Sequence, residues 1–186
     1  MEKKAKYALL IILIFAITAV VLFVMGRTPL CECGYVKLWH GEVISSENSQ
    51  HITDPYSFTH ILHGIALYAL VWLVFRRKTL FQRLLIAVSI ESVWEIMENT
   101  SFAIERYRTE TISLDYYGDS IINSLSDMIM NIIGFLLAAS LPLWGTVLIF
   151  ILIEIFLAWW IRDGLILNML MLIHPFDAIK TWQIGK

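Results

Sequence analysis

Charged residues are scarce in this chain. Only 16% of its 186 residues are Asp, Glu, Lys or Arg, and 58% are hydrophobic, whereas soluble domains average about 25% charged and about 45–50% apolar residues. The basic excess of a nucleic-acid-binding protein is missing, because the formal net charge is -2. Two cysteines are too few for a disulfide-stapled mini-protein, and the apolar content excludes disorder. The composition therefore indicates a protein embedded in a lipid bilayer.

Four or five apolar segments are long enough to cross a hydrocarbon core of ~30 Å, which takes ~20 residues of helix. We predict an all-α integral membrane bundle that forms one domain over 1-186, with about five transmembrane helices. A short helix at 164-174, interfacial or re-entrant, follows them and ends at a proline, which cannot continue a helix. The predicted spans are 7-25, 58-75, 84-104, 120-141 and 143-161, and the longer connections are 26-57 and 105-119.

Basic residues set the predicted orientation. They form two clusters, one in the N-terminal tail and one between the second and third predicted spans. The positive-inside rule places both clusters in the cytoplasm, so that 26-57 and 105-119 face the periplasm of a bacterial inner membrane. The clusters consist of Lys3, Lys4 and Lys6, and of Arg76, Arg77, Lys78 and Arg83.

The signatures of known hydrolases are missing, since the sequence has neither H-E-x-x-H nor G-x-S-x-G. Ionisable residues nevertheless occur inside the predicted spans, where they are rare, costly and often functional. His60 and His63 lie one turn apart in the second span. Glu91, Glu95 and Glu98 share one face of the third span. A central charge costs roughly 2.5–3.5 kcal/mol on insertion scales, so these groups are expected to face the bundle interior.

The topology places most of these groups, with Asp127, in the outer half of the bilayer. We predict that they converge there, either on a divalent metal such as zinc with an open position for water, or on a metal-free site in which a histidine or glutamate acts as general base. The deeper Glu91 is expected to be protonated or paired with a basic or amide partner. The predicted catalytic residues are His60, His63, Glu95, Glu98 and Asp127, and the predicted metal ligands are His60, His63, Glu95 and Asp127.

Other polar residues are predicted to bind a substrate. Amides would orient it, and an arginine would meet an anionic headgroup. The predicted substrate-binding residues are Asn99, Arg106, Asn123, Asn131 and Arg162. The small residues of the fourth span favour close helix packing instead.

The segment 26-57 contains Cys31 and Cys33 in the predicted oxidising compartment. Two interpretations stay open for this pair: a metal-binding or redox loop, with His40 nearby, or a local disulfide staple. The following stretch, 35–51, is too polar for lipid and forms either a lid over the site or a solvated connector.

The run from Asp127 to Gly134, with Asn131, resembles the D-x-x-x-N-x-x-G signature of VanZ-like membrane proteins. That resemblance implies envelope biology, and it implies that a histidine of the second span, a glutamate of the third and Arg106 have counterparts in that family. The Cys-x-Cys loop and the extra acids depart from the pattern, so the glycopeptide resistance of its best-known members is not transferred.

Nearly the whole chain resembles, more closely, an uncharacterised proteobacterial family of multi-pass membrane proteins. The resemblance implies the membrane fold and no activity. It rests on Gly26-Arg-Thr-Pro, Cys-x-Cys-Gly34, Trp39-His-Gly41, Ser-Glu-Asn-Ser-Gln-His51, Trp94-Glu-x-x-Glu-Asn99, Tyr116-Tyr-Gly-Asp-Ser120, Arg162-Asp163 and Pro175-Phe-Asp177.

These observations predict an inner-membrane envelope protein with a polar site in the outer leaflet. One hypothesis is a metal-dependent or acid–base hydrolase or transferase that acts on a lipid or lipid-linked substrate. The alternative is a non-catalytic binding or assembly factor, and a third, less favoured class is an ion or proton transporter. The predicted partners are the bilayer and that substrate, and nucleic acid is not among them.

Overall fold

Four helices of the computed structural model are long and apolar enough to cross a membrane. The structure describes residues 2–111 and 115–185, which contain helices and no strand. The predicted all-α bundle is therefore confirmed. The four helices are α1 (Glu2–Val24), α2 (Ser57–Val74), α5 (Ile121–Ser140) and α6 (Leu143–Trp160).

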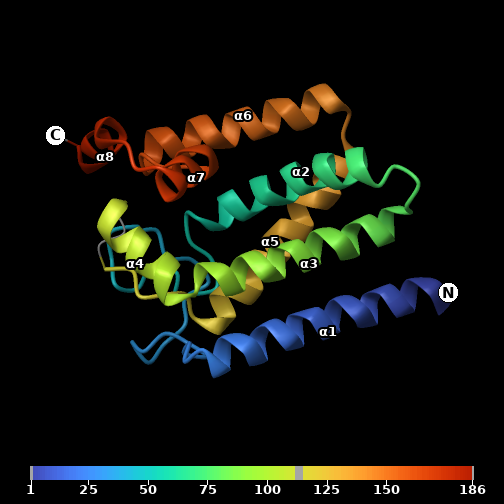
Figure 1. Ribbon diagram of the computed structural model, residues 1–186, viewed down its shortest axis with the longest axis horizontal. Helices are drawn as coiled ribbons and strands as arrows, with labels where there is room; N and C mark the ends of the chain where they lie inside the picture. Colours follow the sequence, from blue (N-terminus) through green and yellow to red (C-terminus); the bar gives the residue numbers. More distant parts are fainter. Residues whose placement is uncertain (1, 112–114, 186) are drawn as a thin grey trace.

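A fifth long helix, α3 (Leu80–Glu98), lies between α1 and α2 (Figure 1). It begins with a capping box, in which the Thr79 hydroxyl accepts a hydrogen bond from Gln82 N and the Gln82 side chain accepts one from Thr79 N. Three acidic side chains set α3 apart from the apolar helices: Glu91, Glu95 and Glu98.

The predicted third span, 84-104, is not one helix. Its helix ends at Glu98, and α4 (Ser101–Glu110) begins after an extended residue, Thr100, whose hydroxyl accepts a hydrogen bond from Ala103 N. Thr100 is therefore the N-cap of a separate helix. The predicted short C-terminal helix matches α7 (Leu165–Ile173), and α8 (Asp177–Ile184) follows it without having been predicted.

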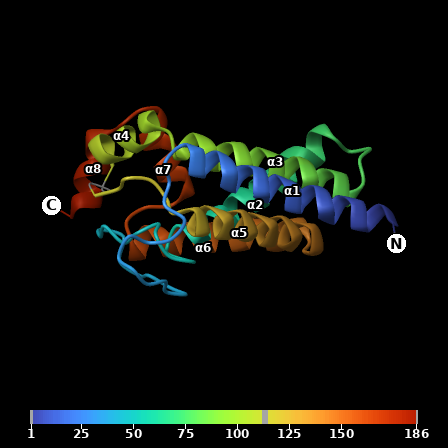
Figure 2. The ribbon, with the colours of Figure 1, turned by 90° about the horizontal axis from the view of Figure 1, so that it is seen from below.

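The two ends of the bundle differ (Figures 1 and 2). The N-terminus, the turn at 75–79 and the turn between α5 and α6 lie at one end. The segment 25–56 and the short helices α4, α7 and α8 gather at the other end, which we name the loop end. Both basic clusters therefore lie on elements at the end opposite the loop end, as the sequence pattern predicts.

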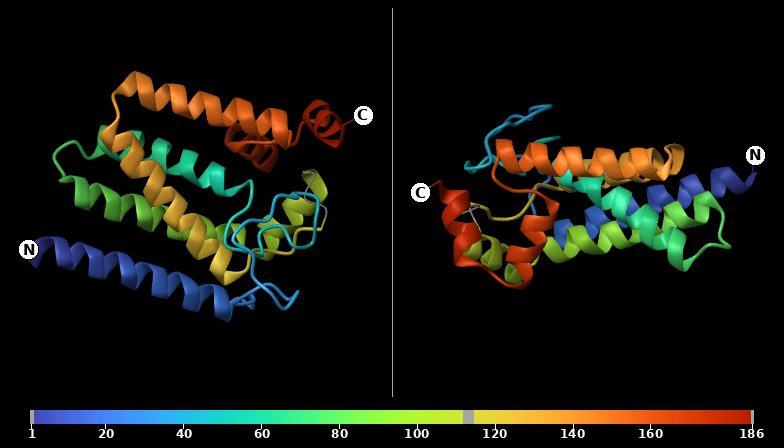
Figure 3. Two further views of the ribbon diagram at one scale, coloured as in Figure 1. Left: turned by 180° about the vertical axis from the view of Figure 1, so that it is seen from behind. Right: turned by 90° about the horizontal axis from the view of Figure 1, so that it is seen from above.

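Helices α2 and α5 form the central pair, and α5 crosses α2 and α3 diagonally when seen from behind (Figure 3). Two glycines allow the close approach. A Cβ on Gly64 would lie 2.0 Å from Asn131 O, and one on Gly134 would lie 2.0 Å from Ile61 O. Small residues serve the same purpose in other membrane helix pairs. This contact fixes how polar residues of α2 meet those of α5.

Candidate functional site

Six ionisable side chains from α2, α3 and α5 meet near the loop end, and we name them the acid–histidine cluster. His60 Nδ1 lies 2.6 Å from Glu91 Oε1 and 3.3 Å from Glu95 Oε1. His63 Nδ1 lies 3.3 Å from the same Glu91 oxygen. The structure thus brings together the residues predicted from helical spacing. The cluster consists of His60, His63, Glu91, Glu95, Glu98 and Asp127.

Within the cluster, two groups of side chains could each hold a metal ion, and both include His60. In each group one ligand atom per residue lies within 4.8 Å of the others. Donors about 2.0–2.2 Å from zinc lie no more than about 4.4 Å apart, so small side-chain movements would bring either group into coordination distance. The groups are His60, His63 and Glu91, and His60, Glu95 and Glu98.

The structure places two of the predicted ligands, Glu95 and Asp127, at different nitrogens of the His60 ring. Asp127 Oδ2 lies 3.9 Å from His60 Nε2, whereas the glutamates face Nδ1 on the opposite edge of the ring. Asp127 and Glu95 therefore do not share one ion through His60. The glutamate beside both histidines is Glu91, which the sequence interpretation left out of the ligands and expected to be paired. Asn131 Nδ2 donates to Glu91 Oε2 at 3.0 Å, so the expected amide partner is present.

Glu95 is distinct from Glu91. Its side chain is only 1% exposed, and within the described part of the chain neither carboxylate oxygen accepts a hydrogen bond. Its nearest cationic candidate is His60, which Glu91 contacts more closely. Burying a carboxylate without donors is costly unless a cation or a proton accompanies it. Glu95 is thus the acid of the cluster with the greatest need for a further partner.

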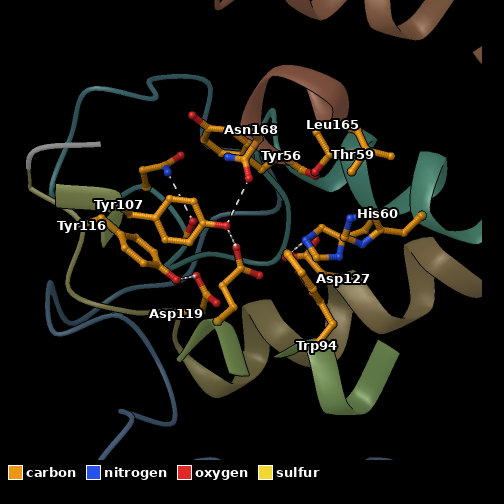
Figure 4. Close-up of a pocket in the computed structure, with 14 residues that line it drawn as sticks. Tyr56, Thr59, His60, Trp94, Tyr107, Tyr116, Asp119, Asp127, Leu165 and Asn168 are labelled. Atoms are coloured by element: carbon orange, nitrogen blue, oxygen red, sulfur yellow. Dashed lines mark hydrogen bonds and ion pairs between the residues drawn. The ribbon is translucent and has the colours of Figure 1, made fainter. Parts of the chain in front are cut away.

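A polar cavity of about 40 Å³ lies beside the cluster, large enough for an ion or a water molecule. His60, Trp94 and Asp127 lie on one side of it, and Tyr107 and Asp119 on the other (Figure 4).

Two tyrosines complete the wall of the cavity. The Tyr107 hydroxyl donates to Glu98 Oε1 at 2.8 Å, and the Tyr116 hydroxyl donates to Asp119 Oδ1 at 3.0 Å. Burial and the adjacent carboxylates raise the pKa of both tyrosines, so the hydroxyls stay protonated and can donate. The sequence did not predict Tyr107, Tyr116 and Asp119 as site residues. They belong to α4 and to the loop before α5, where no helical periodicity links them to the histidines.

The polar stretch at 35–51 folds over the cavity. Asn48 and Ser49 line it, and His51 is fully buried. Asn123 Nδ2 donates to His51 O at 2.9 Å, and Ser120 N donates to Ser49 O at 2.9 Å, which ties this stretch to the start of α5. The end of the stretch, 48–51, therefore covers the cavity as a lid would, whereas most of 35–47 is exposed, as a solvated connector would be.

The predicted substrate-binding amides do not line the cavity. Asn99 Nδ2 donates to Asp119 Oδ2 at 2.8 Å, while Asn123 and Asn131 bind the lid and Glu91 as described. Their side chains position other elements of the site. A substrate would meet amides from Asn48 and Asn168 instead.

The predicted arginines also lie outside the cluster. Arg106 Nε donates to Leu172 O at 3.1 Å, and Arg162 Nη1 donates to Trp182 O at 3.0 Å. These carbonyls belong to the last turns of α7 and α8, where backbone acceptors lack the usual i+4 donor. Both guanidinium groups therefore hold short helices at the loop end.

Cys31 and Cys33 form a disulfide, so their sulfurs are not thiolate ligands in this state. His40 lies near Glu47 and His51 instead. Lys37 Nζ lies 2.7 Å from Glu47 Oε2, and this ammonium, with His51 and Tyr35, lowers the pKa of Glu47 to about 2. The Glu47 carboxylate is already paired, and the staple is the simpler interpretation of the loop. A redox role for the cysteines stays a prediction.

We predict that an Asp119→Asn variant changes how stability depends on pH. Burial and Glu98 raise the pKa of Asp119 from 3.8 to about 7. Since the unfolded chain loses this proton more readily, wild-type stability falls relative to the variant as pH rises from about 4 to about 7, and the difference is then constant. Thermal unfolding in detergent across this range measures it. A difference in unfolding temperature that does not vary with pH would contradict the prediction.

Comparison with known proteins places the chain among relatives without an assigned activity. Residues 22–185 match the family described as "Protein of unknown function (DUF2585)". The chain is 53% identical to a UPF0314 protein of Paracoccus denitrificans, covering 92% of this chain and 89% of the relative. It is 55% identical to a UPF0314 protein of Sinorhizobium fredii, with 92% and 87% coverage. No solved structure matches it. The VanZ-like resemblance stays a prediction.

Proposed function

The chain belongs to the DUF2585 family, and from the geometry of its cavity we propose that it is a membrane-embedded metal-dependent hydrolase or transferase. Its substrate would be a lipid or lipid-linked molecule of the outer leaflet. The observation that carries the proposal is Glu95, a buried carboxylate without a hydrogen-bond donor in the described residues, beside His60 and Glu98 in a group with metal-ligand spacing.

The charge balance of the site supports a bound cation. Three of the residues that line the cavity are carboxylic acids, Glu98, Asp119 and Asp127, and none of the lining residues within the described part of the chain is lysine or arginine. The neighbouring acids Glu91 and Glu95 add to this excess of acidic groups. Histidine and carboxylate ligands are typical of catalytic zinc sites. A divalent metal would supply the positive charge that the protein does not provide here.

The position of the cavity supports a substrate from the outer leaflet. Trp39 of the lid segment stacks on Trp160 at 5.9 Å between ring centroids, and Phe58 contacts Phe156 at 6.3 Å. Such aromatic groups are typical of the membrane–water interface. The basic clusters lie at the opposite end of the bundle (Figure 1), which favours a periplasmic loop end by the positive-inside rule.

The residues around the cavity suit acid–base chemistry. A bound divalent metal would polarise the bond to be cleaved and activate water. In hydrolysis, the water oxygen would add to the electrophilic atom of the ester while its proton passes to Asp127, which lines the cavity and belongs to neither candidate metal group. The bond between that atom and the leaving oxygen would then break, and the leaving oxygen would take the same proton from Asp127. The Tyr107 hydroxyl, 2.8 Å from Glu98 Oε1, holds the Glu98 carboxylate in place.

The test is metal analysis of the purified full-length protein in detergent, with matched glutamine variants. We expect wild type to bind zinc in an equimolar amount, and we expect Glu95→Gln to lose the metal while it keeps the thermal stability of metal-free wild type. Asp119→Asn serves as the control, since Asp119 lines the same cavity but belongs to neither candidate group. Wild type without bound metal after incubation with zinc, or a Glu95→Gln variant that binds as wild type does, would reject the proposal.

One observation favours the non-catalytic alternative. Glu91 contacts His60 and His63 of α2 and accepts from Asn131 of α5, so that one acid of the cluster clearly joins three helices. If the whole cluster were structural, Glu95→Gln and Asp127→Asn would keep the growth phenotype as well as the fold. A complementation assay in a deletion strain separates the two functions.

A further inference from the structure

An apolar groove of about 250 Å³ opens between α2 and α3 beside α7. Its walls are Ala66 and Leu67 of α2, Ile90 of α3 and Met169 of α7. Ala66 is exposed and Ile90 is 40% exposed. Because α2 is one of the apolar spanning helices, the groove faces the hydrocarbon of the bilayer.

The groove is continuous with the polar cavity. His63, Trp94 and Leu165 line both spaces, and Glu91 lies in the groove wall. A molecule with a polar end and a hydrocarbon chain can therefore occupy both spaces at once. The Trp94 indole N–H, at this junction, is buried without an acceptor in the described part of the chain, so a ligand oxygen could accept its hydrogen bond.

The groove alone does not explain affinity. A chain that moves from bilayer hydrocarbon into an apolar groove gains little from the hydrophobic effect, because lipid tails are as apolar as the groove. Binding strength must come from the polar end of the molecule. The cavity of about 40 Å³ admits the reacting linkage of a headgroup and leaves the rest of the headgroup outside.

We propose that this groove binds the hydrocarbon chain of a membrane lipid, with the lipid's polar linkage at the acid–histidine cluster. That this linkage is the group that reacts rests on the proposed function. Two kinds of lipid share this chemistry, acyl lipids and isoprenyl phosphates. Since no lysine or arginine lines the cavity in the described residues, a phosphate at this position would need the metal as its partner.

The proposal is tested by photo-crosslinking of the full-length protein in lipid nanodiscs. One probe is a phosphatidylglycerol with a diazirine in its acyl chain, and the other is an isoprenyl phosphate with a diazirine in its chain. Labelling of the α3 and α7 peptides around Ile90 and Met169 by either probe supports lipid binding in the groove. The probe that labels them shows whether the bound hydrocarbon chain is acyl or isoprenyl. Labelling of these peptides by neither probe overturns it.

Variants that fill the groove make the test specific. Ala66→Trp is expected to lower labelling several-fold, and Ile90→Trp, from the opposite wall, provides a second variant if the first does not fold. Ala69→Trp is the matched control, because Ala69 is also exposed on α2 but lines a different groove, towards α6. Equal labelling of Ala66→Trp and wild type overturns the inference, as does an equal loss in Ala69→Trp.

Metal content separates this inference from the proposed function. All three tryptophan variants are expected to keep their zinc, since none of these positions is a metal ligand. Zinc binding without groove labelling leaves the proposed function and removes the inference. Groove labelling in a protein that binds no zinc leaves the groove as a lipid site and removes the proposed function.

Discussion

Replacement of Gly134 by alanine is expected to destabilise the protein by about 3 kcal/mol or more, at the upper end of the cost of overpacking. The added Cβ would lie 2.0 Å from Ile61 O. That atom belongs to the backbone of α2, so no change of rotamer can remove the clash, and the two helices have to separate. Gly64→Ala is expected to act in the same way against Asn131 O.

Thermal unfolding in detergent measures this effect, and Gly145→Ala is the control. A Cβ at Gly145 meets only the Pro142 side chain, at 3.6 Å, so this substitution should leave stability close to wild type. Because Asn131 of α5 donates to Glu91, which lies in one of the two candidate metal groups, separation of the two helices should also reduce zinc binding. A Gly134→Ala variant as stable as Gly145→Ala would show that α2 and α5 do not pack as described.

Helical periodicity predicted which residues would gather, but not how they would pair. His60 and His63, one turn apart, had to share a face of α2, and the glutamates had to share a face of α3. The pairing depends on how far α3 is shifted along α2, and a single sequence does not contain that offset. The observed offset places Glu91, rather than Glu95, between the two histidines.

The roles of the amides and arginines depended on parts of the fold without periodicity. Residue type alone suggested that Asn123 and Arg106 bind a substrate. In the structure the Asn123 amide donates to His51 O in the segment before α2, and the Arg106 guanidinium donates to Leu172 O at the end of α7. Both acceptors are backbone carbonyls far away in the sequence. The break after Glu98 was missed although the sequence carries a signal for it: Asn99 and Thr100 are residue types that favour helix caps and turns, and the prediction gave more weight to one continuous span.

Replacement of Glu91 by alanine is expected to be the most damaging change within the cluster, costing about 3–5 kcal/mol, as when one partner of a buried ionic pair is removed. The Glu91 side chain is 2% exposed. Its loss removes the acceptor for Asn131 Nδ2 at 3.0 Å and the close partner of His60 at 2.6 Å. The Asn131 amide and the His60 ring would then face the space that the Glu91 side chain had filled, without its carboxylate as a partner.

Glu95→Ala provides the matched comparison, because it removes the same side chain one turn away at nearly the same burial, 1% exposed. Since the Glu95 carboxylate accepts no hydrogen bond within the described residues, its removal leaves fewer groups without a partner and should cost less. Both variants are compared with wild type by thermal unfolding in detergent with a chelator, so that bound metal does not contribute. Equal destabilisation would mean that Glu95 is as structural as Glu91 and would remove the main support for a metal ligand at this position. A larger loss for Glu91→Ala would separate the acid that holds the helices from the acid that is available to a cation.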